Sequence, residues 1–202
     1  MNEAKIIFSA PEMELMKDAT FILTKNIVMQ KMKNVLEGIQ NELFVSIDQL
    51  KTDTDKNIFL TPPKVSKGEN YLGLPYLILD YPRKFAGPDI FAIRSFFWWG
   101  NFFSSTLHLA GDDKKSNLTN IIMSYKELAN ANYFIGVNPD PWQHHFEKNN
   151  YILINEIPIE KFSELCNAHN HLKISIKWTL DDIETATEKI KESWRFLLGC
   201  IY

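Results

Sequence analysis

The sequence predicts an α+β fold: a central, mostly antiparallel sheet built around one aromatic hairpin and packed by long helices near both ends of the chain. Apolar residues recur at spacings of three and four in 26–49 and 180–198, the pattern of a helix with one buried face. Two runs rich in aromatic and β-branched residues flank a Gly-Asn pair within 90–109, as in a β-hairpin. Because the predicted strands follow one another through turns as often as through helices, an antiparallel sheet fits better than a doubly wound parallel one.

The N-terminal part of the chain is expected to be helical. Ser9 and Pro11 suit the cap and first turn of a short helix. The long helix near 26–49 should bury the stripe Val28, Met32, Val35, Leu36, Ile39, Leu43 and Ile47. The polar stretch 64–70 is interpreted as a loop, and 74–81 as a buried strand. With no repeat or linker in 202 residues, we expect a single domain over 1–202.

The remaining elements alternate between short strands and helices. We expect a helix over 118–128 with Asn117 as its cap, and strands at 133–137, 151–155 and 172–178. A further helix fits 159 to about 168. The last helix should start at Thr179, with Asp182 completing a box-like cap three residues later.

The bulk composition limits the partners. A formal charge of −3 and only three arginines argue against a nucleic-acid binder, because such a surface needs an excess of cations. No run approaches the roughly 20 apolar residues of a membrane helix, and no secretory signal stands before Pro11. We therefore expect a cytoplasmic protein with no nucleic-acid or membrane partner. Its richness in Lys, Asn and Ile is typical of an AT-rich bacterial genome.

The sequence indicates no cofactor. Cys166 and Cys200 are too few for a disulfide framework or a cysteine zinc site. Phosphate-loop, dinucleotide and nucleophile-elbow motifs are absent. His169 and His171 would share a face of an extended chain, but no third ligand is indicated nearby, so we predict no metal site.

The hairpin is the best candidate for a functional site. Gly100 at the first central position suits a two-residue type II′ turn, in which Trp99 would pair with Phe102. One face would then run from aromatic residues at the tip to the polar strip Ser95, Ser104, Thr106 and His108. Four aromatic residues flank the tip, and part of the same chain, a second copy or a ligand must cover them.

The functional interpretation is a pocket walled by Phe97, Trp99 and Phe102. Arg94 lies within an apolar strand and needs a buried partner, for which Asp80 and Asp89 are the candidates. The predicted ligand-binding residues are Arg83, Arg94, Trp99, Ser104, Thr106 and His108. In the alternative, the aromatic residues pack beneath the long N-terminal helix and the hydroxyl groups bond one another across strands.

Three functions of different class stay open. The first, which we rank ahead, is binding of a small molecule, an anion included. The second is self-association or partner binding through the hairpin tip, with a homodimer as the expected assembly. The third is a hydrolase-like enzyme that uses His108 with a nearby hydroxyl or carboxylate.

Overall fold

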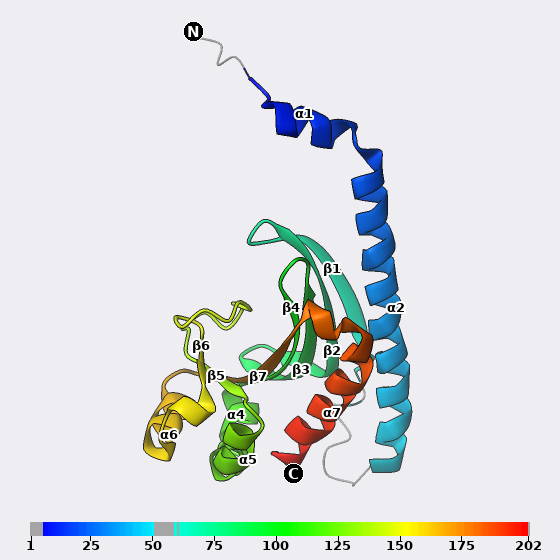
Figure 1. Ribbon diagram of the computed structural model, residues 1–202. Coiled ribbons are helices and arrows are strands. Elements are labelled where there is room, and N and C mark those ends of the chain that lie inside the picture. The colour runs from blue at the N-terminus through cyan, green and yellow to red at the C-terminus, as the bar shows by residue number, and fades with distance from the viewer. Residues whose placement is uncertain (1–5, 51–58, 60, 202) are drawn as a thin grey trace.

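A seven-stranded antiparallel sheet forms the centre of the molecule, with helices at both ends of the chain (Figure 1). The computed structural model describes residues 6–50, 59 and 61–201, and the side chains of 45–50 are not described. The strand order is β1-β2-β3-β4-β7-β5-β6, and every pairing is antiparallel. The predicted α+β class is therefore confirmed.

The elements have the following bounds. The strands are β1 (Lys64–Tyr71), β2 (Leu74–Ala86), β3 (Asp89–Trp98), β4 (Phe102–Ala110), β5 (Phe134–Gly136), β6 (Tyr151–Leu153) and β7 (His171–Thr179). The α-helices are α1 (Ala10–Lys17), α2 (Ala19–Leu50), α4 (Gly111–Met123), α5 (Tyr125–Asn130), α6 (Ile159–Asn167) and α7 (Ala186–Gly199). Two short 3₁₀ helices span Ile154–Glu156 and Leu180–Thr185.

The two N-terminal helices begin at capping side chains. In α1 the Ser9 hydroxyl accepts the backbone N–H of Glu12, and the Glu12 carboxylate accepts the backbone N–H of Ser9, which is a capping box. In α2 the Asp18 carboxylate accepts the backbone N–H of Thr20 at 2.9 Å. The cap position predicted at Ser9 is confirmed.

The long helix buries a stripe close to the predicted one. Its buried members are Met29, Met32, Leu36, Ile39 and Leu43. Val28 is 37% exposed, because Met29 takes its place in the stripe, and Val35 is only partly buried. Ile47 lies outside the described side chains.

Residues 64–70 form strand β1, so the loop predicted there is wrong. β1 pairs with β2 from Lys64 opposite Asp80 onward. It is an edge strand with mostly exposed or half-exposed residues, and its polar composition therefore lacks the alternation that marks a strand. Leu72 and Gly73 supply the positive φ angles of the turn into β2.

The register of the β3–β4 hairpin differs from the predicted one by one residue. Trp98 pairs with Phe102, so Trp99, Gly100 and Asn101 form a three-residue turn in place of the type II′ turn. Gly100 has φ +71°, and the N–H of Asn101 donates to the carbonyl of Trp98. Because strand side chains alternate between faces, this shift moves every β3 residue to the opposite face from the one predicted, relative to β4.

Two of the predicted helix starts are also corrected. α4 begins at Gly111, and Asn117 lies inside it, where its amide donates to the carbonyl of Asp113 at 2.7 Å. After Thr179 the chain first forms the 3₁₀ turn, and α7 begins only at Ala186. Thr179 is the cap residue of that 3₁₀ helix, and its hydroxyl donates to the carboxylate of Asp182 at 3.4 Å, so the predicted pair forms one element earlier than expected.

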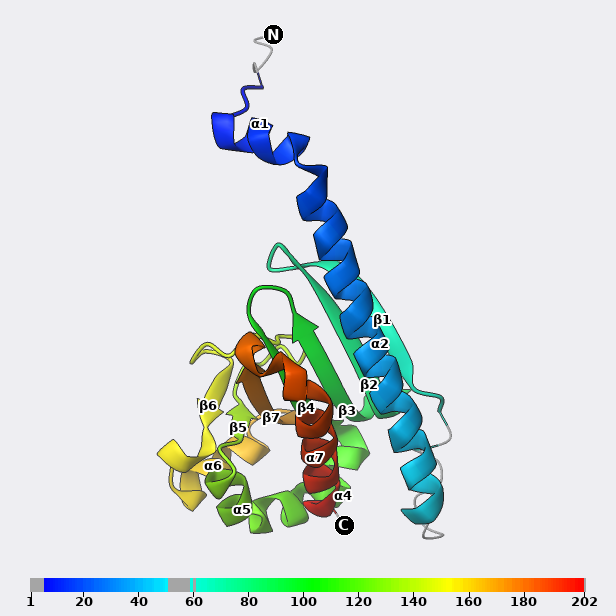
Figure 2. The ribbon, with the colours of Figure 1, turned by 45° about the vertical axis from the view of Figure 1, so that its right-hand side comes forward.

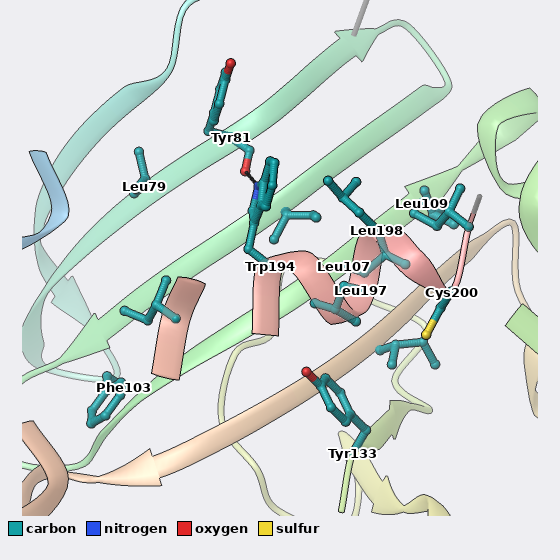
Figure 3. Packing of buried hydrophobic residues seen from close by; sticks show 14 of the residues in the cluster. Leu79, Tyr81, Phe103, Leu107, Leu109, Tyr133, Trp194, Leu197, Leu198 and Cys200 are labelled. Atoms are coloured by element: carbon teal, nitrogen blue, oxygen red, sulfur yellow. Dashed lines mark hydrogen bonds between the residues drawn. The ribbon is translucent and has the colours of Figure 1, made fainter. Parts of the chain in front are cut away.

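The main hydrophobic core lies between the sheet and the helices α2 and α7, which both cross in front of the sheet in Figure 2. Trp194 of α7 is 2% exposed, and its indole N–H donates to the carbonyl of Tyr81 on β2 at 2.9 Å (Figure 3). Leu107 of β4 and Leu197 of α7 are fully buried in the same layer. The helices therefore cover one face of the sheet and leave the other to a different kind of covering.

Candidate functional site

Polar side chains cross the face of the sheet opposite to α2 and α7 in a continuous row. Asp80 on β2 is opposite Arg94 on β3, Arg94 is opposite Thr106 on β4, and Thr106 is opposite Ser175 on β7. The parallel row nearest the hairpin tip is Tyr76, Trp98, Phe102 and Thr179, and the next is Ile78, Phe96, Ser104 and Lys177. The face therefore changes from aromatic at the tip to polar further along the strands.

Four of the six predicted site residues meet on this face. Ser104 and Thr106 lie on adjacent rows, His108 follows opposite Lys173, and the corrected register brings Arg94 to the same side. The polar strip was thus predicted correctly along β4, whereas the β3 residues that pair with it were predicted one position off. Ser95 pairs with Ser105 instead and turns to the helix-covered side.

The other two predicted site residues lie apart from this group. Trp99 is half-buried and packs against the main core, because the three-residue turn places it beyond the paired strands. Arg83 stands opposite Ala92, but its Nε donates to the carbonyl of Pro62 at 2.8 Å, toward the edge of the sheet. The predicted pocket walls change accordingly: Phe97 belongs to the main core, whereas Phe96 and Trp98 join Phe102.

The chain itself covers the aromatic residues at the hairpin tip. Trp98 is 7% and Phe102 8% exposed, and Phe103 is fully buried against Trp178, with ring centroids 5.1 Å apart. The ring of Tyr71 meets Trp98 edge-on at 5.1 Å. The tip therefore offers no broad exposed aromatic surface to a second copy.

The connection between β5 and β6, residues 137–150, covers the polar face. It has no regular secondary structure, and loops of this length are commonly functional. Trp142 places its ring 5.3 Å from His108 and 5.6 Å from the guanidinium carbon of Arg94. His144 places a ring nitrogen 3.4 Å from Nη1 of Arg94. We call the polar side chains that are packed between this loop and the sheet the polar chamber.

Hydrogen bonds anchor the loop at several points. The Tyr71 hydroxyl accepts the backbone N–H groups of His144 and His145, at 2.6 and 2.9 Å. The rings of His169 and His171 lie parallel, and their nitrogens are 3.2 and 3.1 Å from the carbonyls of Val137 and Asn138. The two histidines considered as a metal pair thus contact the backbone. In the described part of the chain, no three His, Cys, Asp or Glu side chains gather as a metal site.

Two buried cations and one carboxylate define the charge of the chamber. Arg94 is 9% exposed and donates to both oxygens of Asp80, at 2.7 and 2.9 Å, so Asp80 is the partner that the sequence required. Lys173 is 2% exposed, donates to the carbonyl of Gln143 at 2.6 Å and lies 4.9 Å above the ring of Tyr151. Burial lowers the pKa of Lys173 to about 8.

The histidines of the chamber are held in their neutral form. Burial, reinforced by Arg94 and Lys173, lowers the pKa of His108 to about 3. Burial likewise lowers the pKa of His171 to about 4 and that of His144 well below its usual value. His108 is 3% exposed, and among the described residues its Nε2 has no hydrogen-bond partner. A buried polar atom of this kind is uncommon in a native fold.

Three hydroxyl groups complete the chamber. Thr106 Oγ1 and Ser175 Oγ are 2.6 Å apart, so hydroxyl pairing across strands, which belonged to the alternative interpretation, does occur. The Tyr151 hydroxyl bonds with the same two groups, and burial raises its pKa. These groups are satisfied within the sheet, which leaves Lys173 and His108 as the polar groups with spare bonding capacity.

A pocket of about 400 Å³ opens beside the hairpin tip on the same face. Its aromatic walls are Trp98, Phe102 and Phe146, and Lys177 lies at its rim, 5.1 and 5.8 Å from the ring centroids of Phe146 and Phe102. The remaining lining residues are Leu72, Asn101, His145 and Glu147. Apolar walls with a few placed polar groups are typical of small-molecule sites.

The sequence did not indicate Lys173, Tyr151 or His144 as site residues. The alternation of Lys173, Ser175 and Lys177 along β7 was visible, but its polar side would ordinarily be expected to face solvent. Only the pairing of β7 with β4 places these residues beside Thr106 and His108.

Comparison of the chain with protein-family models, with curated proteins and with solved structures finds no match. None of the described helices has the length and apolarity needed to cross a bilayer.

Proposed function

We propose that the protein binds a small anionic molecule on the loop-covered face of the sheet. The observation that carries this proposal is the buried positive charge: Arg94 is paired with Asp80, whereas Lys173 donates to a carbonyl and lies above an aromatic ring. The carboxylate that acts on Lys173, that of Asp140, is exposed and makes no ion pair with it. A buried cation is costly unless an opposite charge compensates it. A carboxylate or phosphate group in the chamber would supply that charge.

His108 is the second group suited to such a ligand. Its unpaired Nε2 would donate a hydrogen bond to an anion when the ring is protonated, and a nearby negative charge raises the pKa of a histidine. Binding of the anion would therefore be coupled to the uptake of a proton. Affinity is expected to increase as the pH falls from 7.5 to 5.5.

The pocket beside the hairpin tip is a second anion site, because Phe102 lies roughly 20 Å along β4 from His108 and one small molecule does not reach both. Trp98, Phe102 and Phe146 offer flat apolar surfaces, and Lys177 at the rim offers a further positive charge. A molecule with an aromatic body and a carboxylate matches this combination. Entry to the chamber itself requires the loop 137–150 to shift. Such a shift breaks hydrogen bonds of the loop to Tyr71 and Lys173 and separates the ring of Phe146 from that of Tyr151.

An enzyme that uses His108 as a general base is less well supported. A pKa of about 3 makes the ring a weak base at neutral pH, and general bases work best with a pKa near the working pH. The described contacts of His108 are to aromatic and cationic groups, without an orienting carboxylate.

Calorimetry with two matched probes tests the proposal. Phenylacetate and 2-phenylethanol share an aromatic ring and differ in charge, and inorganic phosphate tests the anion alone. We expect phenylacetate to bind, and 2-phenylethanol to bind at least tenfold more weakly (about 1.4 kcal/mol). Lys177→Gln should weaken phenylacetate binding, whereas Lys126→Gln, an exposed change on α5, should leave it unaltered.

The role of His108 is tested by titration with inorganic phosphate in two buffers of different ionisation enthalpy. Proton uptake on binding should appear in the wild-type protein and decrease in His108→Gln. Equal affinity for the charged and uncharged probes, or no binding of either phenylacetate or phosphate at millimolar concentration, would contradict the proposal.

A further inference from the structure

The N-terminal helices extend away from the body of the molecule. Both views of the ribbon show α1 and the first turns of α2 beyond the end of the sheet (Figures 1 and 2). No residue of α1 is buried, and in α2 the first buried residue is Met29. We call residues 6–28 the N-terminal arm.

Apolar side chains are concentrated on this arm. Eleven large apolar residues within it are between 37% and 80% exposed: Ile6, Ile7, Phe8, Met13, Leu15, Met16, Phe21, Ile22, Leu23, Ile27 and Val28. If each half-exposed side chain contributes about 80 Å² of accessible surface, the eleven residues together present roughly 900 Å² of apolar surface. Because this sum includes every side of the arm, only part of it belongs to one contiguous patch, for which about 300–600 Å² is the largest value on a typical monomer.

The helix α1 needs contacts that its own chain does not provide. It has 8 residues, and its capping box satisfies only the N-terminal backbone groups. Isolated helices shorter than about 12–15 residues are marginal in water, and most helical stability in proteins comes from packing of an apolar face. A partner that covers Leu15 and Met16 would supply that packing, since these two residues are 55% and 66% exposed.

The charges of the arm favour a protein partner over an anionic membrane. The arm contains three acidic residues, Glu12, Glu14 and Asp18, and two basic ones, Lys17 and Lys25. It therefore lacks the excess of Lys and Arg that is typical of membrane-surface helices. The sign of the charge changes along the chain: α1 is net acidic, and residues 19–31 of α2, which extend just beyond the arm, contain Lys25 and Lys31 without an acidic residue. Lys31 is exposed, whereas Lys25 is paired with Glu69.

A surface with neighbouring acidic and basic parts is complementary to itself under a twofold rotation. We infer that the N-terminal arm is the interface with a second copy of this chain, in which α1 of each copy packs on the first half of α2 of the other. This dimer does not depend on ligand binding at the polar chamber, and it involves a different part of the molecule from the hairpin tip.

Sedimentation velocity of the full chain tests the inference. The wild-type protein is expected to sediment with twice the chain mass of 23.5 kDa. The double variant Leu23→Glu/Ile27→Glu should sediment as a monomer, because it places two charges where the apolar surfaces meet. Met123→Glu is the matched control: Met123 is 75% exposed on α4, away from the arm, and this variant should stay dimeric.

Circular dichroism and urea unfolding monitored by tryptophan fluorescence test whether the double variant folds. We expect that it does, because both positions are exposed within the monomer. A wild-type monomer at about 100 µM, well above the Kd of a micromolar dimer, would overturn the inference, and so would a double variant that stays dimeric. Flotation with phosphatidylcholine vesicles, with and without phosphatidylserine, tests whether a membrane covers the arm instead of a second copy. Vesicle binding by a monomeric wild-type chain that the double variant loses would make a membrane the occupant of the arm and overturn the dimer.

Discussion

The two faces of the sheet are built from the same strands and differ in what covers them. On one face Leu79, Ile93 and Leu107 meet the helices α2 and α7 in a continuous apolar core. On the other, Arg94, Thr106 and Ser175 lie beneath the loop 137–150, which contacts them with rings, carbonyls and hydroxyl groups. Both faces are buried, so burial alone does not distinguish core from site. The difference lies in what is buried, which is mainly apolar side chains on the first face and charged and polar side chains on the second.

The stability of the molecule should therefore depend mainly on the helix-covered face. Leu107→Ala removes a fully buried side chain between the sheet and α7. We expect a loss of about 3–5 kcal/mol in the free energy of unfolding, from lost burial and from the cavity left behind. Urea unfolding followed by circular dichroism measures it. A loss below about 1 kcal/mol would show that the two faces do not differ in this way.

The ion pair between Arg94 and Asp80 on the loop-covered face should affect stability mainly when only one of its two charges is removed. Arg94→Leu leaves the carboxylate of Asp80 without its bidentate partner, and we expect a loss of about 3 kcal/mol. Asp80→Leu/Arg94→Leu removes both charges and should recover most of that loss. If the double variant were no more stable than Arg94→Leu alone, the loss would not come from the unpaired carboxylate of Asp80.

Much of the helix-covered face was predictable, because periodicity reports burial directly. The stripe from Met32 to Leu43 and the capping at Ser9 follow from spacing and residue type. The loop-covered face was only partly predictable. Ser104, Thr106, His108 and Arg94 were identified, but a one-residue difference in the hairpin turn put Arg94 on the face opposite to the predicted one and replaced Trp99 by Trp98.

The rest of the site depends on pairings between distant segments. Lys173 meets His108 only because β7 joins the sheet beside β4, and local sequence does not specify such an arrangement. Strand β1 was missed for a related reason. An edge strand lies against one neighbour only, so its polar sequence resembles that of a loop.

The neutral histidines should make stability depend on pH through the loop-covered face. The pKa values of His108 and His171, about 3 and 4 in the folded state, lie below the unfolded value of about 6.5. The unfolded chain therefore binds protons that the folded chain does not. The contribution of the two neutral rings to the free energy of unfolding is complete above about pH 6.5, and it is lost as the pH falls toward 4. At pH 5 the loss is about 2 kcal/mol for each ring.

Urea unfolding of the wild type and of His108→Gln at pH 8 and pH 5 isolates one of these contributions. The difference in stability between the two pH values should be about 2 kcal/mol smaller in the variant. Phosphate in the buffer should also reduce the loss in the wild-type protein, if an anion occupies the chamber. An unchanged pH dependence in His108→Gln would show that this ring is not held neutral by burial.

The smallest expected effect is at Thr106, the residue next to Leu107 on the opposite face. Thr106→Val keeps the shape of the side chain and removes the hydroxyl that lies 2.6 Å from Ser175. We expect a loss of about 1 kcal/mol, the usual value for one buried hydrogen bond. Thr119→Val, an exposed change on α4, is the control and should be close to neutral, because Thr and Val have similar helix propensities.

The polar row that crosses β2, β3, β4 and β7 also has a consequence for how the chain finds its fold. A slip of one residue between neighbouring strands would turn Arg94 toward the apolar residues beneath α2 and α7, away from Asp80. Such a misaligned hairpin would carry an unpaired charge into an apolar layer and would be rejected during assembly. The residues of this row therefore favour one register in strands whose aromatic and aliphatic side chains would tolerate several.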